Sequence, residues 1–159
     1  MPLDPQQQRV YTWEGGWIDW DSPTLTLTKA REYVHWACAL YGLRPPCVKS
    51  HPGKEYSWSL GRAISFRRSQ ISRATALHEV AHYICDQLFG LDMEAHSPEW
   101  VAVYFWLLIE ARVAPRTAIC ASAKAKRLRW VPLWQVSPKR LAGLAQRYHT
   151  KKSLLPPAR

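Results

Sequence analysis

Apolar positions along the chain follow helical spacing in some stretches and strand spacing in others. From residue 25 to residue 41 they recur at roughly helical spacing, which predicts a helix of about five turns. Ser22-Pro23 is suited to an N-cap followed by a first helical residue, and Gly42 with Pro45-Pro46 ends the pattern. We expect this helix to support a small sheet from behind.

Three short segments after this helix have the composition of strands: Cys47–His51, Tyr56–Leu60 and Ala63–Arg67. Pro52-Gly53 predicts a turn between the first two, and Gly61 permits a bend before the third. The pattern predicts a short, mainly antiparallel sheet. The third strand comes just before the next helix, so we expect a free edge there that can pair with an extended peptide.

Arginines at positions 62, 67 and 68 lie in and beside the third predicted strand. They are either the rim of a substrate cleft or ordinary surface residues, and the sequence does not distinguish the two. Residues 1–21 are also open to two interpretations. Aromatic residues around Gly15-Gly16 fit a short hairpin, whereas the polar run before them fits a helical turn.

Two further helices are predicted in the second half of the chain. Ser69 or Ser72 can cap the first, which extends to about Leu88 before Gly90 ends it. Ser97-Pro98 is suited to begin the second, whose residues 100–109 are apolar nearly all round and therefore buried. The order of elements predicts a small α+β domain.

The first of these helices contains the sequence HEVAH, from residue 78 to residue 82. His78 and His82 are four residues apart, so they project from the same helical face and can hold one zinc ion. Glu79 can reach a water on such an ion without being a ligand, as a general base must. The pentapeptide is only moderately specific, and a fortuitous occurrence in a metal-free fold is one of the alternatives.

His96 directly precedes Ser97-Pro98 and is the predicted third ligand. The chain between His82 and His96 is long enough to return a third imidazole to the first two. Glu99, Glu94 and Asp92 are the alternative third ligands. Cys85 is one helical turn beyond the expected metal, and we interpret it as a core thiol.

Charge is distributed unevenly over the 159 residues, whose formal net charge is +10. Residues 1–110 have a net charge of −2, while residues 111–159 contain twelve Lys or Arg and no acid. We therefore divide the chain into a domain at residues 1–112 and a basic helical extension at residues 113–159. The extension is suited to nucleic acid or an acidic protein surface, or is a solvated tail. The predicted contacts are Lys124, Lys126, Arg127, Arg129, Lys139 and Arg140, with Trp130 and Trp134 as stacking residues.

The four cysteines are scattered without a C-x-x-C pair, which is typical of a reduced, cytoplasmic protein with inert core thiols. No segment has the composition of a signal peptide or the length of a membrane span. We expect no membrane partner, and a location in the cytoplasm of a bacterium or, for a phage protein, in its host or virion.

HEVAH, followed by a short loop and HSPEW at the start of an apolar helix, resembles the zincin metallopeptidases. It is most similar to the SprT-like group, in which HExxH precedes an HGPEF-type helix start; Ser97 replaces that glycine and Trp100 the aromatic residue. Small actinobacterial metallohydrolases share this layout and an opening similar to Asp4–Glu14. The resemblance covers roughly residues 1–112. It implies one zinc ion bound by His78, His82 and His96, with Glu79 as general base.

The sequence therefore leads to two hypotheses about function. The first is a zinc-dependent hydrolase, in particular a metallopeptidase acting on a protein or peptide and brought to nucleic acid or DNA-bound protein by its basic extension. The alternative is a non-catalytic nucleic-acid-binding or assembly protein on a zincin scaffold, such as a phage structural protein within a larger assembly.

Overall fold

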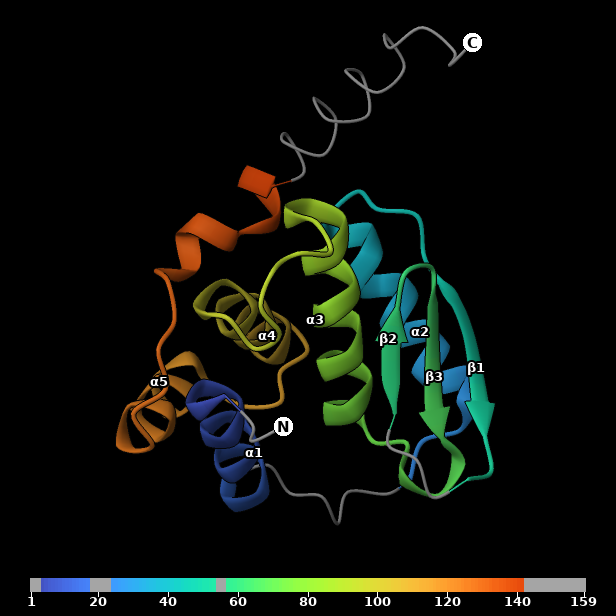
Figure 1. The fold of residues 1–159 in the computed structure, drawn as a ribbon, viewed down its shortest axis with the longest axis horizontal. Coiled ribbons are helices and arrows are strands. Elements are labelled where there is room, and N and C mark those ends of the chain that lie inside the picture. The colour runs from blue at the N-terminus through green and yellow to red at the C-terminus, as the bar shows by residue number, and fades with distance from the viewer. Residues whose placement is uncertain (1–3, 18–23, 54–56, 142–159) are drawn as a thin grey trace, which may run out of the picture.

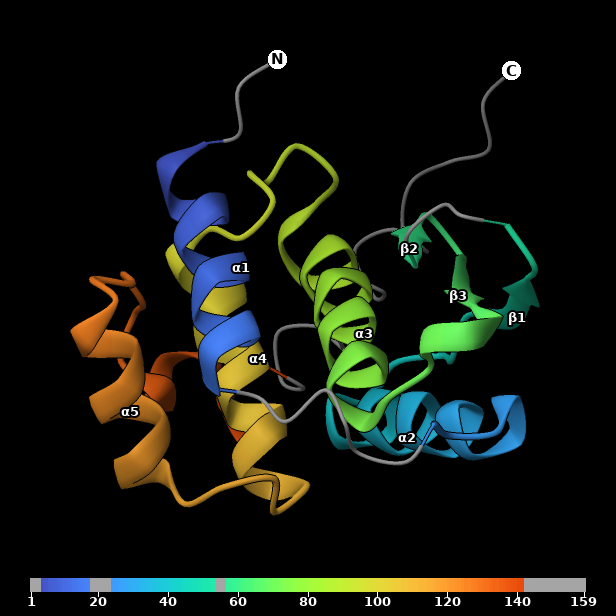
Figure 2. The same ribbon diagram turned by 90° about the horizontal axis from the view of Figure 1, so that it is seen from below.

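The computed structural model describes residues 4–17, 24–53 and 57–141 of the chain. A three-stranded sheet lies on one side and a group of helices on the other, with α3 (Arg73–Phe89) between them (Figures 1 and 2). The α+β class predicted from the sequence is confirmed. Within these ranges, no helix combines the length and apolar character needed to cross a bilayer.

Helix α2 (Leu27–Leu40) supports the sheet and α3, as predicted, but starts later than the sequence indicated. Thr26 caps it, with its hydroxyl accepting a hydrogen bond from the backbone N–H of Lys29 at 3.1 Å. The predicted cap at Ser22-Pro23 lies outside the described residues. The buried positions of the helix form one stripe: Ala30, Val34, Ala37 and Cys38.

The sheet contains β1 (Cys47–His51), β2 (Trp58–Leu60) and β3 (Ala63–Arg67) in the order β1-β3-β2. The β2–β3 pairing is antiparallel, as predicted, and the β1–β3 pairing is parallel. Gly61, at φ +57°, makes the tight turn that folds β3 back onto β2. Pro52-Gly53 therefore does not connect neighbouring strands.

The prediction of a free edge on β3 is wrong, because β3 is the central strand and pairs on both sides. β2 forms an edge of the sheet instead, and it contacts α3. The edge strand beside α3 is therefore β2.

Helices α3 and α4 (Pro98–Glu110) begin and end where the sequence predicts. The hydroxyl of Ser72 accepts a hydrogen bond from the backbone N–H of Thr75 at 3.0 Å, and Gly90 ends α3 with φ +97°. Ser97 caps α4 in the same way, through the N–H of Trp100 at 3.2 Å. Both helices are buried over most of their length, so the centre of the molecule is rigidly packed.

The N-terminal segment, left open by the sequence, is a helix, α1 (Pro5–Trp17). One carboxylate oxygen of Asp4 accepts hydrogen bonds from the backbone N–H groups of Gln6 and Gln7, at 2.8 and 3.1 Å. Asp4 is thus the N-cap of α1 and Pro5 its first helical residue, the same arrangement as Ser97 and Pro98 at the start of α4. Val10 and Trp13 fix the helix to the core, with 1% of each residue exposed.

The predicted extension is described as far as residue 141, and that part packs into the same core as the rest of the chain. It comprises α5 (Arg116–Ala125), a 3-10 turn η2 (Leu133–Val136) and connecting segments. Its buried residues include Ile119, Ala123, Leu128, Leu133, Val136 and Leu141. Arg147 and the cations after it lie outside the described residues.

Side chains of α1 form hydrogen bonds with this C-terminal segment. The Gln6 side chain donates a hydrogen bond to the carbonyl of Arg129 at 2.7 Å and accepts one from its N–H at 3.3 Å. The indole N–H of Trp13 donates to the hydroxyl of Ser122 at 2.9 Å. The segment after residue 112 therefore helps to position α1.

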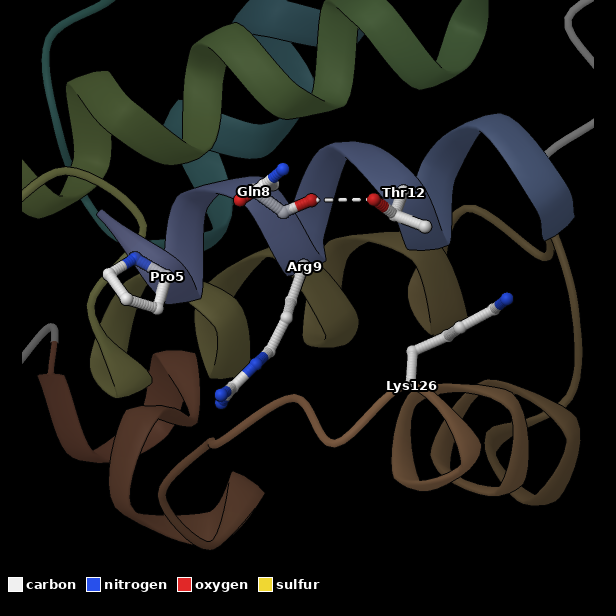
Figure 3. A pocket seen from close by; sticks show the side chains of 5 residues that line it. All are labelled: Pro5, Gln8, Arg9, Thr12 and Lys126. Atoms are coloured by element: carbon white, nitrogen blue, oxygen red, sulfur yellow. Dashed lines mark hydrogen bonds between the residues drawn. The ribbon is translucent and has the colours of Figure 1, made fainter. Parts of the chain in front are cut away.

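A polar hollow of about 320 Å³ lies where α1 meets the C-terminal end of α5 (Figure 3). Arg9 and Lys126 line it, together with Pro5, Gln8 and Thr12. Arg9 also donates a hydrogen bond to the carbonyl of Arg127 at 3.3 Å. The hollow is thus part of a basic surface that α1 and the residues after α5 form together.

The four cysteines are free thiols and differ in exposure. Cys38 and Cys85 are buried, as expected for core thiols, and burial raises the pKa of Cys38 to about 12. Cys47 is exposed, so the expectation of core thiols is wrong for this residue.

Candidate metal centre

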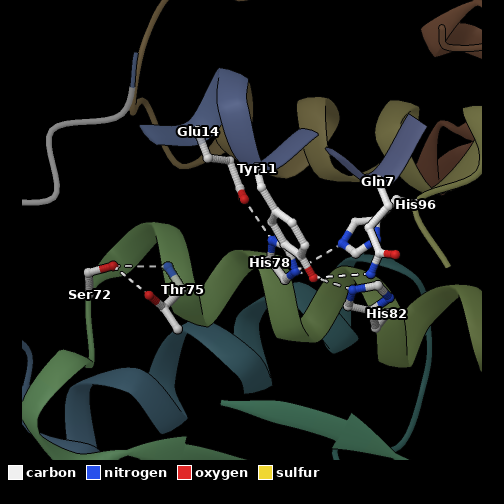
Figure 4. A network of polar contacts seen from close by, with 8 residues as sticks. All are labelled: Gln7, Tyr11, Glu14, Ser72, Thr75, His78, His82 and His96. Atoms are coloured by element: carbon white, nitrogen blue, oxygen red, sulfur yellow. Dashed lines mark hydrogen bonds and ion pairs between the residues drawn. The ribbon is translucent and has the colours of Figure 1, made fainter. Parts of the chain in front are cut away.

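Helix α3 brings His78 and His82 together on the face directed toward α1 and the start of α4 (Figure 4). The Nε2 atoms of the two rings are 3.2 Å apart. His78 is buried and His82 is half-buried, so the pair lies at the floor of a cleft. The one-turn spacing in the sequence is sufficient to produce this arrangement.

His96 adds the third ring from the loop between α3 and α4, with its Nε2 3.3 Å from that of His78. Its backbone has φ +61°, the left-handed conformation that costs most residues about 1–2 kcal/mol. Ser97, where the resembled pattern has glycine, has an ordinary φ of −55° that requires no glycine. The strained residue is therefore the candidate ligand itself, a common property of functional sites.

Two of the three distances between the candidate ligand nitrogens match those around a tetrahedral zinc ion, and the three ligand atoms all lie within 4.8 Å of one another. A zinc–nitrogen distance of about 2.1 Å places tetrahedral ligands about 3.4 Å apart, and the two Nε2 distances to His78 are 3.2 and 3.3 Å. Of the described residues, His78, His82 and His96 form the one group of three or more potential ligands with mutually close ligand atoms. The site can thus hold a metal ion.

Hydrogen bonds among the three imidazole rings would satisfy their Nε2 atoms less well than a bound metal ion would. The Nδ1 atom of His78 faces Glu14, so in the neutral ring its N–H lies there and Nε2 has a single lone pair. His82 and His96 both direct Nε2 at that lone pair, and it accepts only one strong hydrogen bond. A protonated His78 has the same problem, because its one Nε2–H serves one neighbour. A cation satisfies all three nitrogens.

The surroundings of His82 and His96 favour neutral rings, the form that binds metal. Burial and then the charge on His78 lower the pKa of His96 to about 3. Burial and the charges of the two other histidines lower the pKa of His82 well below its usual value. Trp100 packs against all three imidazoles, with ring centroids 4.4–4.8 Å away, and excludes water from that side.

Glu14 of α1 orients the central ring of the cluster. Its carboxylate lies 2.7 Å from Nδ1 of His78, and 3% of the residue is exposed. Burial opposes protonation of His78, but the charge and hydrogen bond of Glu14 and the charge of Glu79 raise its pKa overall. A carboxylate on the far nitrogen of a metal-binding histidine fixes the tautomer and makes the ring a stronger ligand.

Tyr11 and Gln7, also on α1, border the same cleft (Figure 4). The ring of Tyr11 stacks on that of His78 at 6.3 Å and meets His96 edge-on at 5.1 Å. Its hydroxyl accepts a hydrogen bond from the Gln7 amide at 3.3 Å. Glu14, Tyr11 and Gln7 were not identified from the sequence, although their spacing of three and four places them on one face of a helix.

Glu79 is buried in α3 and borders the cleft beside the three histidines. Burial raises its pKa to about 7; the charge of His78 opposes this rise and that of Glu14 adds to it. A carboxyl group with this pKa can both accept and release a proton near neutral pH, as general acid–base chemistry requires.

The other candidate ligands do not join the cluster. Cys85, Asp92, Glu94 and Glu99 contribute no atom to the group of potential ligands found in the described part of the chain. A tetrahedral metal ion held by the three histidines would have no fourth protein ligand from these residues, as in catalytic rather than structural zinc sites. The arginines at positions 62, 67 and 68 do not line this cleft.

The six predicted polyanion contacts lie away from the metal centre. Helix α5 is on the opposite side of α1 and α4 from α3 (Figures 1 and 2). All six are exposed: Lys124, Lys126, Arg127, Arg129, Lys139 and Arg140. Trp134 is 61% exposed and lies 4.9 Å beneath the guanidinium of Arg140, while Trp130 packs against Phe105 in the core.

Replacing Glu14 with glutamine is expected to weaken zinc binding by about 10–100-fold, because the neutral amide no longer polarises His78. Competition with a chromophoric chelator measures this change. Glu110→Gln, which removes an exposed carboxylate at the end of α4, is the control and should bind zinc normally. Equal affinities in Glu14→Gln and the wild type would show that Glu14 does not tune the metal site.

The comparisons with known proteins give no family for this chain. No protein-family model matches it, and no curated protein or solved structure does so either.

Proposed function

We propose that this protein is a zinc-dependent hydrolase, and specifically a metallopeptidase. The observation that supports this most directly is the convergence of three imidazole nitrogens beside a buried carboxyl group at the floor of a cleft. Three neutral nitrogen ligands in a tetrahedral arrangement suit zinc, whereas calcium and magnesium prefer oxygen ligands.

Each of the proposed residues has a separate role in the reaction. When bound, zinc supplies a Lewis acid that polarises a carbonyl group and lowers the pKa of a water. Glu79 takes the proton from the attacking water and passes it to the leaving amine. Glu14 holds His78 in one tautomer and orientation, and Trp100 keeps bulk water away from the buried side of the rings.

An extended substrate fits along β2, the strand at the edge of the sheet nearest the cleft. The cleft volume of about 420 Å³ accommodates a few residues of peptide. Backbone hydrogen bonds to an edge strand hold a peptide in extended form, so every second carbonyl group points away from that strand.

Metal removal tests this proposal. The purified protein is expected to contain about one zinc ion per chain and to hydrolyse an unfolded protein such as casein. Treatment with 1,10-phenanthroline should abolish hydrolysis, and zinc added after dialysis should restore it, while magnesium should not. Hydrolysis that continues at the same rate in the metal-free protein would contradict the proposal.

The alternative, a nucleic-acid-binding or assembly protein, is supported by the exposed cations around α5 and by the acid-free sequence after residue 110. Arg9 and Lys126 in the adjoining hollow extend this basic side. Binding through such a surface is independent of the metal centre, so it is compatible with a hydrolase brought to a polyanion.

Replacing Lys124, Lys126, Arg127 and Arg129 together with glutamine is expected to weaken binding to a DNA duplex and to reduce its salt dependence. Each lost phosphate contact lowers the slope of log K against log salt by about 0.9. Fluorescence anisotropy over a salt series measures the slope. Arg44→Gln/Arg68→Gln, two exposed cations elsewhere, is the control. Deleting residues 113–159 is unsuitable, since residues up to 141 hold α1 in place.

An unchanged slope in the quadruple variant would contradict DNA binding through α5. The same variant should keep its zinc and its peptidase activity, because none of the four residues borders the metal cleft. The result therefore separates the two functions.

A further inference from the structure

The cleft above the metal centre combines apolar side chains with acidic ones. Leu60 at the end of β2 is 71% exposed, and Leu91 in the loop after α3 is 68% exposed. Both border the cleft, as do the half-buried Trp58 and Met93. The C-terminal ends of β2 and α3 lie at the same end of the molecule, so the two leucines belong to one rim (Figure 1). Exposed apolar side chains that converge on a polar cleft are a feature of binding sites.

Among the described residues that line the cleft, the charged side chains are acidic. The histidines are the exception when they are protonated. Asp86 and Glu94 border the cleft in addition to Glu79, and the described lining includes no lysine or arginine. Within the described ranges, no ion pair involves Asp86 or Glu94. Asp86 is half-buried, and this burial raises its pKa. A cationic group of a ligand would offset the negative charge of these carboxylates.

This charge distribution opposes a phosphate-rich ligand in the cleft. Phosphates beside Asp86, Glu94 and Glu79 would add like charges that no lysine or arginine of the described lining offsets, so the proposed zinc ion would be the one cation there apart from protonated histidines. Helix α5, which carries Lys124 and is followed by Lys126, Arg127 and Arg129, lies on the other side of α1 and α4 (Figure 2). A polyanion held there and a substrate in the cleft would thus occupy separate surfaces.

We propose that the cleft binds an extended peptide that places an apolar side chain against Leu60 and Leu91 and a lysine or arginine toward Asp86 and Glu94. This inference rests on the proposed peptidase function and specifies its substrate class. Burying an apolar side chain on the leucine rim favours binding by about 25 cal/mol per Å² removed from water. The two carboxylates add selectivity for positive charge.

Four peptides of equal length test the proposal. They carry Leu or Asp at the central position and Lys or Glu two residues away, with a fluorophore at one end. Binding is measured by anisotropy to the zinc-loaded Glu79→Gln variant, so the result does not depend on turnover. We expect the Leu/Lys peptide to bind at least tenfold more tightly than the Asp/Glu peptide. Equal affinities, or preference for Asp/Glu, would overturn the inference.

Two variants assign the preference to the named residues in the same Glu79→Gln background. Asp86→Asn/Glu94→Gln should abolish the preference for Lys over Glu, and Leu60→Ser/Leu91→Ser the preference for Leu over Asp. Phe89→Ser is the matched control, because Phe89 is 40% exposed near Leu91 but does not border the cleft. A preference that survives in the double variants would show that the peptide binds elsewhere.

The same peptides separate failure of this inference from failure of the proposed function. If the wild type cleaves none of them while Glu79→Gln still binds Leu/Lys best, the substrate chemistry of the cleft is supported and the hydrolase proposal is not. If the wild type cleaves all four at equal rates and Glu79→Gln binds them equally, the hydrolase proposal stands and this inference is overturned.

Discussion

Glu79→Gln is expected to lower kcat/KM for peptide hydrolysis by about 10²–10⁴-fold while leaving zinc binding intact. Glutamine has the shape of glutamate, so it fits the buried position in α3 without a cavity. Its amide cannot take a proton from the attacking water or deliver one to the leaving amine. Because Glu79 is not part of the cluster of potential ligands, the zinc content should be unchanged.

Paired measurements make this prediction specific. Metal analysis of the purified variant gives zinc per chain, and a quenched fluorescent peptide gives the rate. Asp92→Asn is the matched control, since Asp92 is an exposed carboxylate in the loop after α3 and does not border the cleft. It should retain both zinc and activity. Full activity in Glu79→Gln would exclude Glu79 as the general base.

The part of the site on α3 and α4 could be predicted from the sequence because it depends on local rules. A one-turn spacing places His78 and His82 on one face, and Ser72 and Ser97 mark the starts of two helices. His96 directly precedes the second start, so its position near the other histidines followed from the length of the loop. Its left-handed backbone did not follow, because that conformation is set by tertiary contacts.

The contribution of α1 could not be predicted in the same way. Glu14 contacts His78 across 64 positions of sequence, and nothing in the local pattern of either segment indicates its partner. Gly15-Gly16 resembled a hairpin turn, yet it occupies the last turn of a helix, although glycine is a weak helix former. Burial of Val10 and Trp13 offsets this weak propensity. The polar run before the glycines, which fits a helical turn, was the better guide.

The order of the strands could not be predicted from the sequence for a different reason. Segments of three to five residues can form strands, but their composition does not specify which neighbours pair. The tight turn at Gly61 pairs β2 with β3, and β1 then takes the remaining edge of β3. The edge strand beside the metal centre is therefore β2, which carries Leu60 into the cleft.

His78→Ala is expected to abolish stabilisation of the protein by zinc. A ligand that binds only the folded state stabilises it by about 2.7 kcal/mol at one hundred times its dissociation constant. For a chain of this length that corresponds to a rise in Tm of about 5–10 °C. Without His78 the central nitrogen of the cluster is lost, and both close contacts between ligand atoms, 3.2 and 3.3 Å, disappear with it. Zinc should then raise Tm by less than about 1 °C.

Replacing His78 with alanine also removes its buried hydrogen bond with Glu14. This variant should therefore be less stable than the wild type even without zinc. His82→Ala distinguishes the two effects, because His82 is half-buried and its Nε2 faces His78, whereas Glu14 contacts Nδ1 of His78. It should lose the zinc-dependent rise in Tm with a smaller loss of stability in the metal-free protein. His35→Ala, at an exposed position of α2, should respond to zinc like the wild type. A full zinc response in both His78→Ala and His82→Ala would place the metal elsewhere, because two of the three converging nitrogens would then be unnecessary for binding it.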